Sequence, residues 1–301
     1  MRIGVLGIGD IAKKGYLPVL VNVKDVQVIP CTRNADTLKE VMERYHLSEG
    51  YTDVDEFLRQ PLDGVYVTAA TSAHYALSMK VIDAGIPLHL DKPISLDYTE
   101  TQNLVEYAQA KNNFLMIGFN RRFVPIVKKV HDEGKPDIVI YQKNRDMHPD
   151  NLRRFIVEDF IHVVDTTRYL LQDEVVELRV HGKKEGDTLM HVVVNMITPS
   201  NQGILIMNYL NGVTEEIIEV SHPHKKSIIR NLAQLEVYDH SDFIKKSESD
   251  WIPTLKKRGF EDLRDAFLNA LKTKAPSPVN GPDALRTHQL CEEIVTKLES
   301  Q

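Results

Sequence analysis

Lys92 is, by residue type and position, the side chain of this sequence best suited to transfer a proton. It follows the apolar run 86–90 and stands between Asp91 and Pro93. A proline cannot donate a hydrogen bond to a sheet ladder, so a strand is expected to end at this tripeptide. Partial burial and a nearby cation lower the pKa of a lysine that projects from a strand end into a cleft, and it can then exchange a proton. Lys92 is therefore a candidate acid or base.

Asp159 and His162 form a second candidate pair. They lie three residues apart in the run 155–172, which has the apolar spacing of a helix, so they share one face of it. A carboxylate beside an imidazole can hold the ring in one orientation. The alternative is a buried histidine that attaches the helix to a sheet.

The segment "GIGDIA" predicts a turn that binds a dinucleotide. Gly7 permits a tight turn after a strand, Gly9 lets the backbone approach a pyrophosphate, and Ala12 is small enough for the next helix to pack closely. Asp10 and Ile11 begin that helix, whose free N–H groups would face the phosphates. The alternative is a turn that merely needs glycines.

The next two strand ends add further candidates for cofactor contact. Thr32 and Arg33 stand where an NAD-binding protein usually has an acid for the ribose hydroxyl, and an arginine favours a 2′-phosphate. We therefore favour NADP(H) over NAD(H), although Arg33 could instead stack on the adenine or lie in solvent. Ser72 or Thr71 can cap the next helix, and His74 lies in the first turn of that helix, as a ligand contact or a supporting group.

The elements that must position these residues alternate along the first 120 residues. Apolar β-branched runs predict strands, and runs with helical spacing predict helices between them. This alternation predicts an α/β fold with a doubly wound parallel sheet of the Rossmann type, in which ligands bind beyond the carboxyl ends of the strands. Strands are expected at 2–8, 26–32, 63–70, 86–92 and 114–120, and helices at 11–22, 35–47, 71–85 and 95–112.

The pattern changes after Asn120. Strand-like runs joined by short turns follow the helix 155–172 and predict a large, mostly antiparallel sheet in an α+β domain. We expect one strand before that helix, at 136–145, and strands after it at 174–182, 188–198, 203–212, 214–222, 226–231 and 233–239, with final helices at 260–272 and 282–300. The predicted domains are 1–120, which binds the dinucleotide, and 121–301, which binds substrate and forms oligomers.

Composition excludes several classes of function. The chain has 301 residues and a formal net charge of -6, with no dense basic stripe, which argues against a nucleic-acid partner. No long apolar segment indicates a membrane span, and no motif indicates a metal site. Cys31 and Cys291 give no disulfide framework, so the cytoplasm is the expected location.

Four motifs together resemble the Gfo/Idh/MocA oxidoreductases, most closely the MviM-like members. They are "GIGDIA", "TSAH", "DKP" and "GFNRRF" at 118–123. The resemblance implies that Lys92 meets the reacting hydroxyl and that Asp91, where relatives usually have Glu, lies near the nicotinamide ribose. It also implies that Arg121, beside Asn120, lines the cleft near the cofactor.

The resemblance also bears on the helix of the second half. Relatives carry an acid and a His there; the His contacts the substrate hydroxyl, and either it or the lysine takes the proton. The usual spacing selects Glu158 as the acid, whereas Asp159 also lies beside His162, so the assignment between them is open. We favour Asp159.

Four basic residues precede this helix. Lys143, Arg145, Arg153 and Arg154 could clamp a carboxylate or phosphate of the substrate, or they could lie in a solvated loop. The sheet face that carries His191 and Asn195 is a candidate interface, as in relatives, for a homodimer or higher homo-oligomer.

The predicted function is NAD(P)-dependent hydride transfer to or from a secondary alcohol or carbonyl of a small sugar-like or cyclitol-like molecule. Lys92 and His162 would handle the proton, and Asp159 would hold the imidazole. Two alternatives stay open: a dinucleotide-binding regulator without chemistry, and a lyase or hydrolase that uses bound NAD⁺ transiently.

Overall fold

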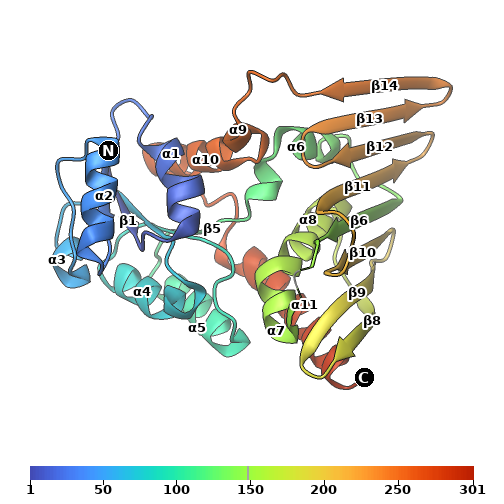
Figure 1. The fold of residues 1–301 in the computed structure, drawn as a ribbon, viewed down its shortest axis with the longest axis horizontal. Coiled ribbons are helices and arrows are strands. Elements are labelled where there is room, and N and C mark those ends of the chain that lie inside the picture. The colour runs from blue at the N-terminus through green and yellow to red at the C-terminus, as the bar shows by residue number, and fades with distance from the viewer. Residues whose placement is uncertain (148) are drawn as a thin grey trace. The chain divides into compact units, whose positions relative to one another are not determined.

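A computed structural model describes residues 1–147 and 149–301 of the chain. Its contacts divide the chain into two compact units (Figure 1). Unit 1 comprises Met1–Phe119 and Phe260–Leu285, and unit 2 comprises Asn120–Gly259 and Arg286–Gln301. Each unit has its own sheet and is described by itself. Among the described residues, no helix combines the length and apolar character that crossing a membrane requires.

Unit 1 contains the parallel sheet that the sequence predicts. The strand order is β2-β1-β3-β4-β5, and every neighbouring pair is parallel. All residues of β3, β4 and β5 are buried, as expected for a parallel sheet covered on both faces. The strands are β1 (Arg2–Leu6), β2 (Gln27–Cys31), β3 (Gly64–Val67), β4 (Leu88–Leu90) and β5 (Leu115–Ile117).

Helices follow the strands of unit 1, and α2, α3 and α5 begin at polar caps. Asn34 caps α2 by accepting a hydrogen bond from the Thr37 N–H, and Asp97 caps α5 in the same way from Thr99 and Glu100. The predicted helix 11–22 contains a π-helical turn, η1, which gives way to α1 next to Pro18. The elements are η1 (Ala12–Tyr16), α1 (Leu17–Leu20), α2 (Ala35–Tyr45), α3 (Val54–Leu58), α4 (Thr71–Asp83) and α5 (Tyr98–Ala110).

A late segment of the chain completes unit 1. Helix α10 (Phe260–Thr273) places Phe267 against Tyr66 and His89, with ring centroids 4.9 and 5.5 Å apart. Phe260 packs where a side chain at Gly15 would come within 2.8 Å of its ring. Residues 260–285 therefore belong with the first sheet, whereas the sequence analysis assigned all of 121–301 to the second domain. Phe260 and Phe267 account for the difference, because their partners lie in the first 120 residues.

Unit 2 contains a nine-stranded, mostly antiparallel sheet. The order is β14-β13-β12-β11-β6-β10-β9-β7, with β8 paired to β9; the pair β6 and β10 is parallel. The sequence analysis did not predict β7 or β14. The strands are β6 (Ile138–Asn144), β7 (Asp150–Asn151), β8 (Glu177–Glu185), β9 (Thr188–Ile197), β10 (Gln202–Asn208), β11 (Glu215–His222), β12 (Lys225–Arg230), β13 (Gln234–Asp239) and β14 (Asp242–Ser247).

Helix α8 (Ile161–Leu171) covers one face of this sheet at β6 and β10. Gly203 permits the close approach, because a Cβ there would lie 2.5 Å from Cγ2 of Thr167. Alternate residues of β9 and β10 are buried against this side, and the residues between them are half-buried on the other. The remaining elements are η2 (Asn120–Phe123), α6 (Pro125–His131), α7 (Leu152–Arg154), η3 (Phe155–Phe160), α9 (Thr254–Lys257) and α11 (Gly281–Glu299).

Candidate active site

Gly7 and Gly9 serve different purposes in the turn after β1. Gly7 has φ +91°, and a Cβ there would lie 2.5 Å from the Ala69 Cα, so the fold itself requires glycine. A Cβ on Gly9 would meet only the Thr68 carbonyl oxygen, at 3.9 Å. Open space therefore lies beside Gly9, and the fold does not require a glycine there. This open cradle at the start of a helix fits the close approach of a pyrophosphate.

Hydrogen bonds join the first three strand ends of unit 1. The Gly7 N–H donates to the Cys31 carbonyl at 2.9 Å, and the Thr68 hydroxyl donates to the Gly7 carbonyl at 2.7 Å. Beyond Cys31, Thr32 is half-buried and Arg33 is exposed. The predicted contact of Arg33 with the ribose hydroxyl or 2′-phosphate of a cofactor stays a prediction.

The helix that starts at Asp10 carries the other predicted residues of this turn. Asp10 is exposed and pairs with Lys14 at 2.7 Å, and this hydrogen bond and charge lower the Asp10 pKa. Ile11 is half-buried, and Ala12 is fully buried against the strand, as its small size predicts. The backbone at Asp10 and Ile11 thus lies at the helix N-terminus, beside the Gly9 cradle.

His74 ties the end of β3 to the segment after β4. It is buried, and its Nδ1 lies 2.7 Å from the Pro93 carbonyl oxygen, while its Nε2 lies 2.9 Å from that of Ala69. These two contacts fix the position of the loop that begins at Lys92. Thr71 does not cap α4 as the sequence suggested: Ala70 is the N-cap, no described side chain caps the helix, and Thr71 is its half-buried first residue. Hydrogen bonds therefore link the ends of β1, β2, β3 and β4, which carry the predicted residues of unit 1, into one strand-end constellation.

Asp91 and Lys92 differ sharply in exposure. Asp91 is 8% exposed, and its Oδ1 accepts a hydrogen bond of 2.6 Å from the Tyr16 hydroxyl. Burial raises the pKa of Asp91, and the charge of Lys92 and the Tyr16 hydrogen bond oppose part of that rise. Lys92 is half-buried, and its peptide bond to Pro93 is cis. Gly118 leaves room for the hydrogen bond between Tyr16 and Asp91, because a Cβ there would lie 2.6 Å from the Tyr16 hydroxyl oxygen.

In unit 2, Asp159 anchors the helical segment η3 to the sheet. Its carboxylate forms an ion pair with Lys143, accepts hydrogen bonds of 3.0 and 3.1 Å from Arg145, and accepts one of 2.9 Å from the Tyr209 hydroxyl. Burial alone would raise the pKa of Asp159, but the charges of Lys143 and Arg145 outweigh it and hold the pKa well below its usual range. The sequence did not predict this anchoring, and the orienting of His162 by Asp159 stays a prediction.

The π-helical turn at 155–160 distinguishes the two candidate acids. Glu158 pairs with Arg154 at 3.2 Å, whereas Asp159 points to the sheet. His162 is 9% exposed on the first turn of α8. π-Helical turns inside longer helices are frequent at functional sites.

Asn120 and Arg121 are held inside unit 2. Asn120 donates through Nδ2 to the Arg258 carbonyl at 2.9 Å. Arg121 donates to Oε1 of Glu216 through Nε at 2.8 Å and pairs with it through Nη2 at 2.6 Å. Burial alone would raise the Glu216 pKa, but the Arg121 charge outweighs it and lowers the pKa. The cofactor contacts of Asn120 and Arg121 remain predictions.

Comparison with known proteins supports the oxidoreductase prediction. A Gfo/Idh/MocA family model, described as an oxidoreductase family with an NAD-binding Rossmann fold, matches residues 1–119. A myo-inositol 2-dehydrogenase of Thermotoga maritima is 28% identical, over 94% of this chain and 92% of the relative. The similarity thus extends beyond the nucleotide-binding unit.

Solved structures agree along the whole chain. A Gfo/Idh/MocA family oxidoreductase from Vibrio cholerae has a TM-score of 0.94 and 28% identity, covering 100% of this chain and 99% of that one. A dehydrogenase (MviM) from Clostridium difficile has a TM-score of 0.92 and 23% identity, covering 99% of both chains. The family model and the named relatives support an NAD(P)-dependent oxidoreductase with a Rossmann domain. Residues 1–119 are thus similar to the Gfo/Idh/MocA family, and the similarity to the Vibrio cholerae structure extends along the whole chain.

Proposed function

We propose that the protein transfers a hydride between a nicotinamide cofactor and a secondary alcohol or carbonyl of a sugar, polyol or cyclitol-like substrate. The observation that carries this proposal is the half-buried Lys92 at the end of β4, in the same strand-end constellation as the open Gly9 cradle. The similarity to a myo-inositol 2-dehydrogenase supports the substrate class.

Some of the predicted site residues would bind the cofactor, and others would transfer the proton. When bound, the nicotinamide donates or accepts the hydride. Lys92 Nζ would take the hydroxyl proton as the alcohol becomes a carbonyl, directly or in relay with the His162 ring, and would return it in the reverse direction. Asp159 would set the position of His162. The cofactor holders would be Gly7, Gly9, Asp10, Ile11, Ala12, Thr32, Arg33, Thr71, His74, Asp91, Lys92, Asn120 and Arg121.

We favour NADP(H) as the cofactor. The exposed Arg33 has no carboxylate beside it in the sequence to receive a ribose 2′-hydroxyl, and its guanidinium suits a 2′-phosphate. The cytoplasm fits the two free, buried cysteines Cys31 and Cys291, because a reducing compartment keeps thiols unbonded.

The test is the variant Lys92→Met, assayed by nicotinamide absorbance across a panel of sugars and cyclitols. A positioned acid or base contributes about 10²–10⁴ in rate, so kcat falls by that factor while NAD(P)H binding is retained. Lys111→Met is the matched control, because Lys111 is a half-exposed lysine at the end of α5 that pairs with Asp83 at 3.8 Å.

Each alternative function gives a different result. A regulator binds the dinucleotide but changes its absorbance with no member of the panel. A lyase or hydrolase converts substrate without net change in the nicotinamide. Wild-type turnover by Lys92→Met, with Lys111→Met equally active, excludes the role proposed for Lys92.

A further inference from the structure

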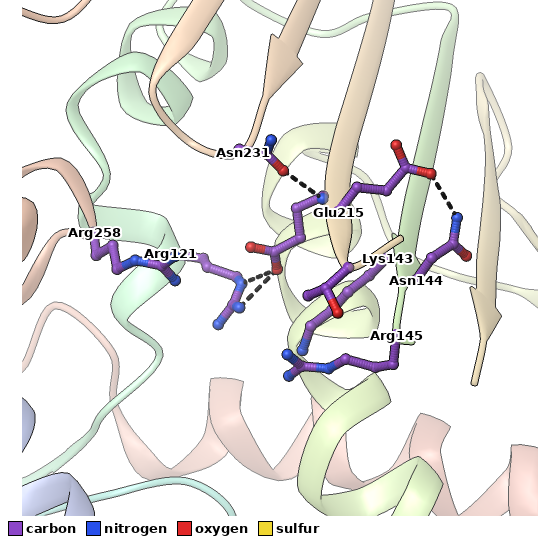
Figure 2. A pocket seen from close by; sticks show the side chains of 9 residues that line it. Arg121, Lys143, Asn144, Arg145, Glu215, Asn231 and Arg258 are labelled. Atoms are coloured by element: carbon purple, nitrogen blue, oxygen red, sulfur yellow. Dashed lines mark hydrogen bonds and ion pairs between the residues drawn. The ribbon is translucent and has the colours of Figure 1, made fainter. Parts of the chain in front are cut away.

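A polar pocket of about 340 Å³ opens in unit 2 at the ends of β6 and β11. Figure 2 shows Lys143, Asn144 and Arg145 following β6 along one side of it, with Arg121 and Arg258 entering from the other. The register pairs Lys143 with Glu216 and Asn144 with Glu215 across the two strands. Because successive residues of a strand face opposite sides, Lys143 and Glu216 share the sheet face that α8 covers.

Positive charge exceeds negative charge on this face. Arg121, Lys143 and Arg145 supply three cations, whereas Glu216 and Asp159 supply two carboxylates. Arg121 alone pairs with Glu216, and the other two cations share Asp159. One cation of this cluster is therefore left without its own counter-charge.

Arg258 adds a further cation to the pocket. Arg258 is exposed, and within the described part of the chain no carboxylate pairs with its guanidinium. The carboxylate of Glu215, which also lines the pocket, accepts a hydrogen bond of 3.0 Å from the Asn144 amide. The Arg258 guanidinium is thus available to a molecule that enters the pocket.

Lys143 has the most buried side chain of the four cations that line the pocket. Its side chain is only 3% exposed, and burial lowers its pKa to about 8, with the nearby Asp159 charge opposing that change. An additional negative group in the pocket would offset the cost of keeping this amine charged in a buried position. Among the described residues, the Lys143 ammonium donates only to Asp159, at Oδ1 and the backbone oxygen, and an ammonium carries three donors.

We propose that this pocket binds an anionic oxygen group, a carboxylate or phosphate, carried by the substrate. Arg258, Lys143 and Arg145 hold that group, and the substrate is then an acidic sugar or a sugar phosphate rather than a neutral polyol. That the bound molecule is the substrate rests on the proposed function. The binding chemistry rests on the pocket alone.

Isothermal titration calorimetry of the full-length protein, with nicotinamide dinucleotide bound, tests the inference. The probes are glucose, glucuronate, glucose 6-phosphate and inorganic phosphate. Glucuronate and glucose 6-phosphate differ from glucose at one carbon, so they separate the two sources of anionic oxygen. We expect at least one of them to bind about tenfold more tightly than glucose, because charge-assisted hydrogen bonds are the stronger ones.

The variant Arg258→Gln is expected to weaken binding of the anionic probe about tenfold and to leave glucose unchanged. Arg179→Gln removes the same charge from an exposed arginine of β8 that pairs with Glu177 at 2.7 Å, and is expected to change nothing. The pocket is not an anion site if no anionic probe, inorganic phosphate included, binds more tightly than glucose. The same conclusion follows if Arg258→Gln leaves the preference intact.

Calorimetry needs no turnover, so the two proposals can fail separately. An anion preference without hydride transfer supports the pocket and rejects the proposed function. Hydride transfer with no preference for the charged sugars rejects the pocket and retains the proposed function.

Discussion

At the scale of single residues, Arg33 is expected to decide which nicotinamide cofactor binds. Its guanidinium is exposed just beyond β2, so replacing it with glutamine removes a charge-assisted contact to a 2′-phosphate. We expect Arg33→Gln to raise the Kd of NADPH about tenfold and to leave that of NADH nearly unchanged, as measured by nicotinamide fluorescence titration. Arg44→Gln, at the other end of α2, serves as control. An equal loss of affinity for both cofactors would contradict selection by Arg33.

His89 is expected to make stability depend on pH. It is fully buried between the rings of Tyr16, Tyr66 and Phe267, and neither ring nitrogen has a hydrogen-bond partner among the described residues. Burial lowers its pKa to about 3, below the 6.5 of an unfolded histidine. The unfolded state therefore binds the additional proton between these values, and stability falls as pH falls from about 6.5 towards 3.

The variant His89→Leu removes that titration with little change in volume. At pH 5 the histidine costs about 2 kcal/mol relative to neutral pH, so the loss of unfolding free energy between pH 7.5 and 5 should be smaller by that amount in the variant. Chemical denaturation at the two pH values measures it. His181→Leu, at an exposed position of β8, should keep the wild-type pH dependence. An unchanged pH dependence in His89→Leu would show that another group causes it.

At the scale of elements, the turn after β1 separates folding from binding. Gly7→Ala should destabilise unit 1 by about 1–3 kcal/mol or more, because of its positive φ and the contact with Ala69. Gly9→Ala should change the unfolding free energy by less than about 0.5 kcal/mol, since its Cβ enters open space. It should nevertheless raise the Kd of the cofactor about tenfold, because the methyl group would occupy the place of the pyrophosphate. Thermal unfolding measures the stability of both variants, and fluorescence titration measures their cofactor affinity. An unchanged cofactor affinity in Gly9→Ala would show that the pyrophosphate does not bind beside Gly9.

The regular elements were predictable because the local pattern determines them. Strand runs such as 2–8 and 63–70 contain β1 and β3, and Asn34 and Asp97 act as caps in the ordinary way. The π-helical turns at 12–16 and 155–160 were not predictable, because they add a residue to a turn without changing the apolar spacing enough to be seen. Strand β14 is exposed at every residue, so it lacks the apolar alternation that identifies a strand.

The candidate site was predictable only in part, for a related reason. Glycines, the strand-end lysine and the helix histidine have recognisable contexts along the chain. Lys143 and Glu216 become partners only when β6 and β11 pair, although each occupies an inward position of an alternating strand. A charged residue at such a position is a usable signal, because burial of an unpaired charge is costly. The packing of Phe267 on the first sheet depends in the same way on distant partners.

At the scale of the whole molecule, the face of the unit 2 sheet opposite α8 is expected to join copies of the chain. Ile140, Val193, Ile204 and Ile206 lie half-buried on this face, together with His191 and Asn195. Side chains at Ile204 and Ile140 are direct neighbours, as are those at Ile206 and Val193. A contiguous apolar area rimmed by polar residues is typical of protein interfaces. We therefore expect a homodimer or higher homo-oligomer in solution.

The variant Ile206→Arg tests this arrangement. A charge at the centre of an apolar interface must be desolvated without a partner, so we expect the dissociation constant to rise at least about 100-fold and the protein to become monomeric at micromolar concentration. Size-exclusion chromatography with light scattering measures the mass. Ile244→Arg, on the exposed edge strand β14 where Ile244 is 46% exposed, is the control and should keep the wild-type mass. If Ile244→Arg dissociates the oligomer and Ile206→Arg does not, the interface lies at the sheet edge and not on the face opposite α8.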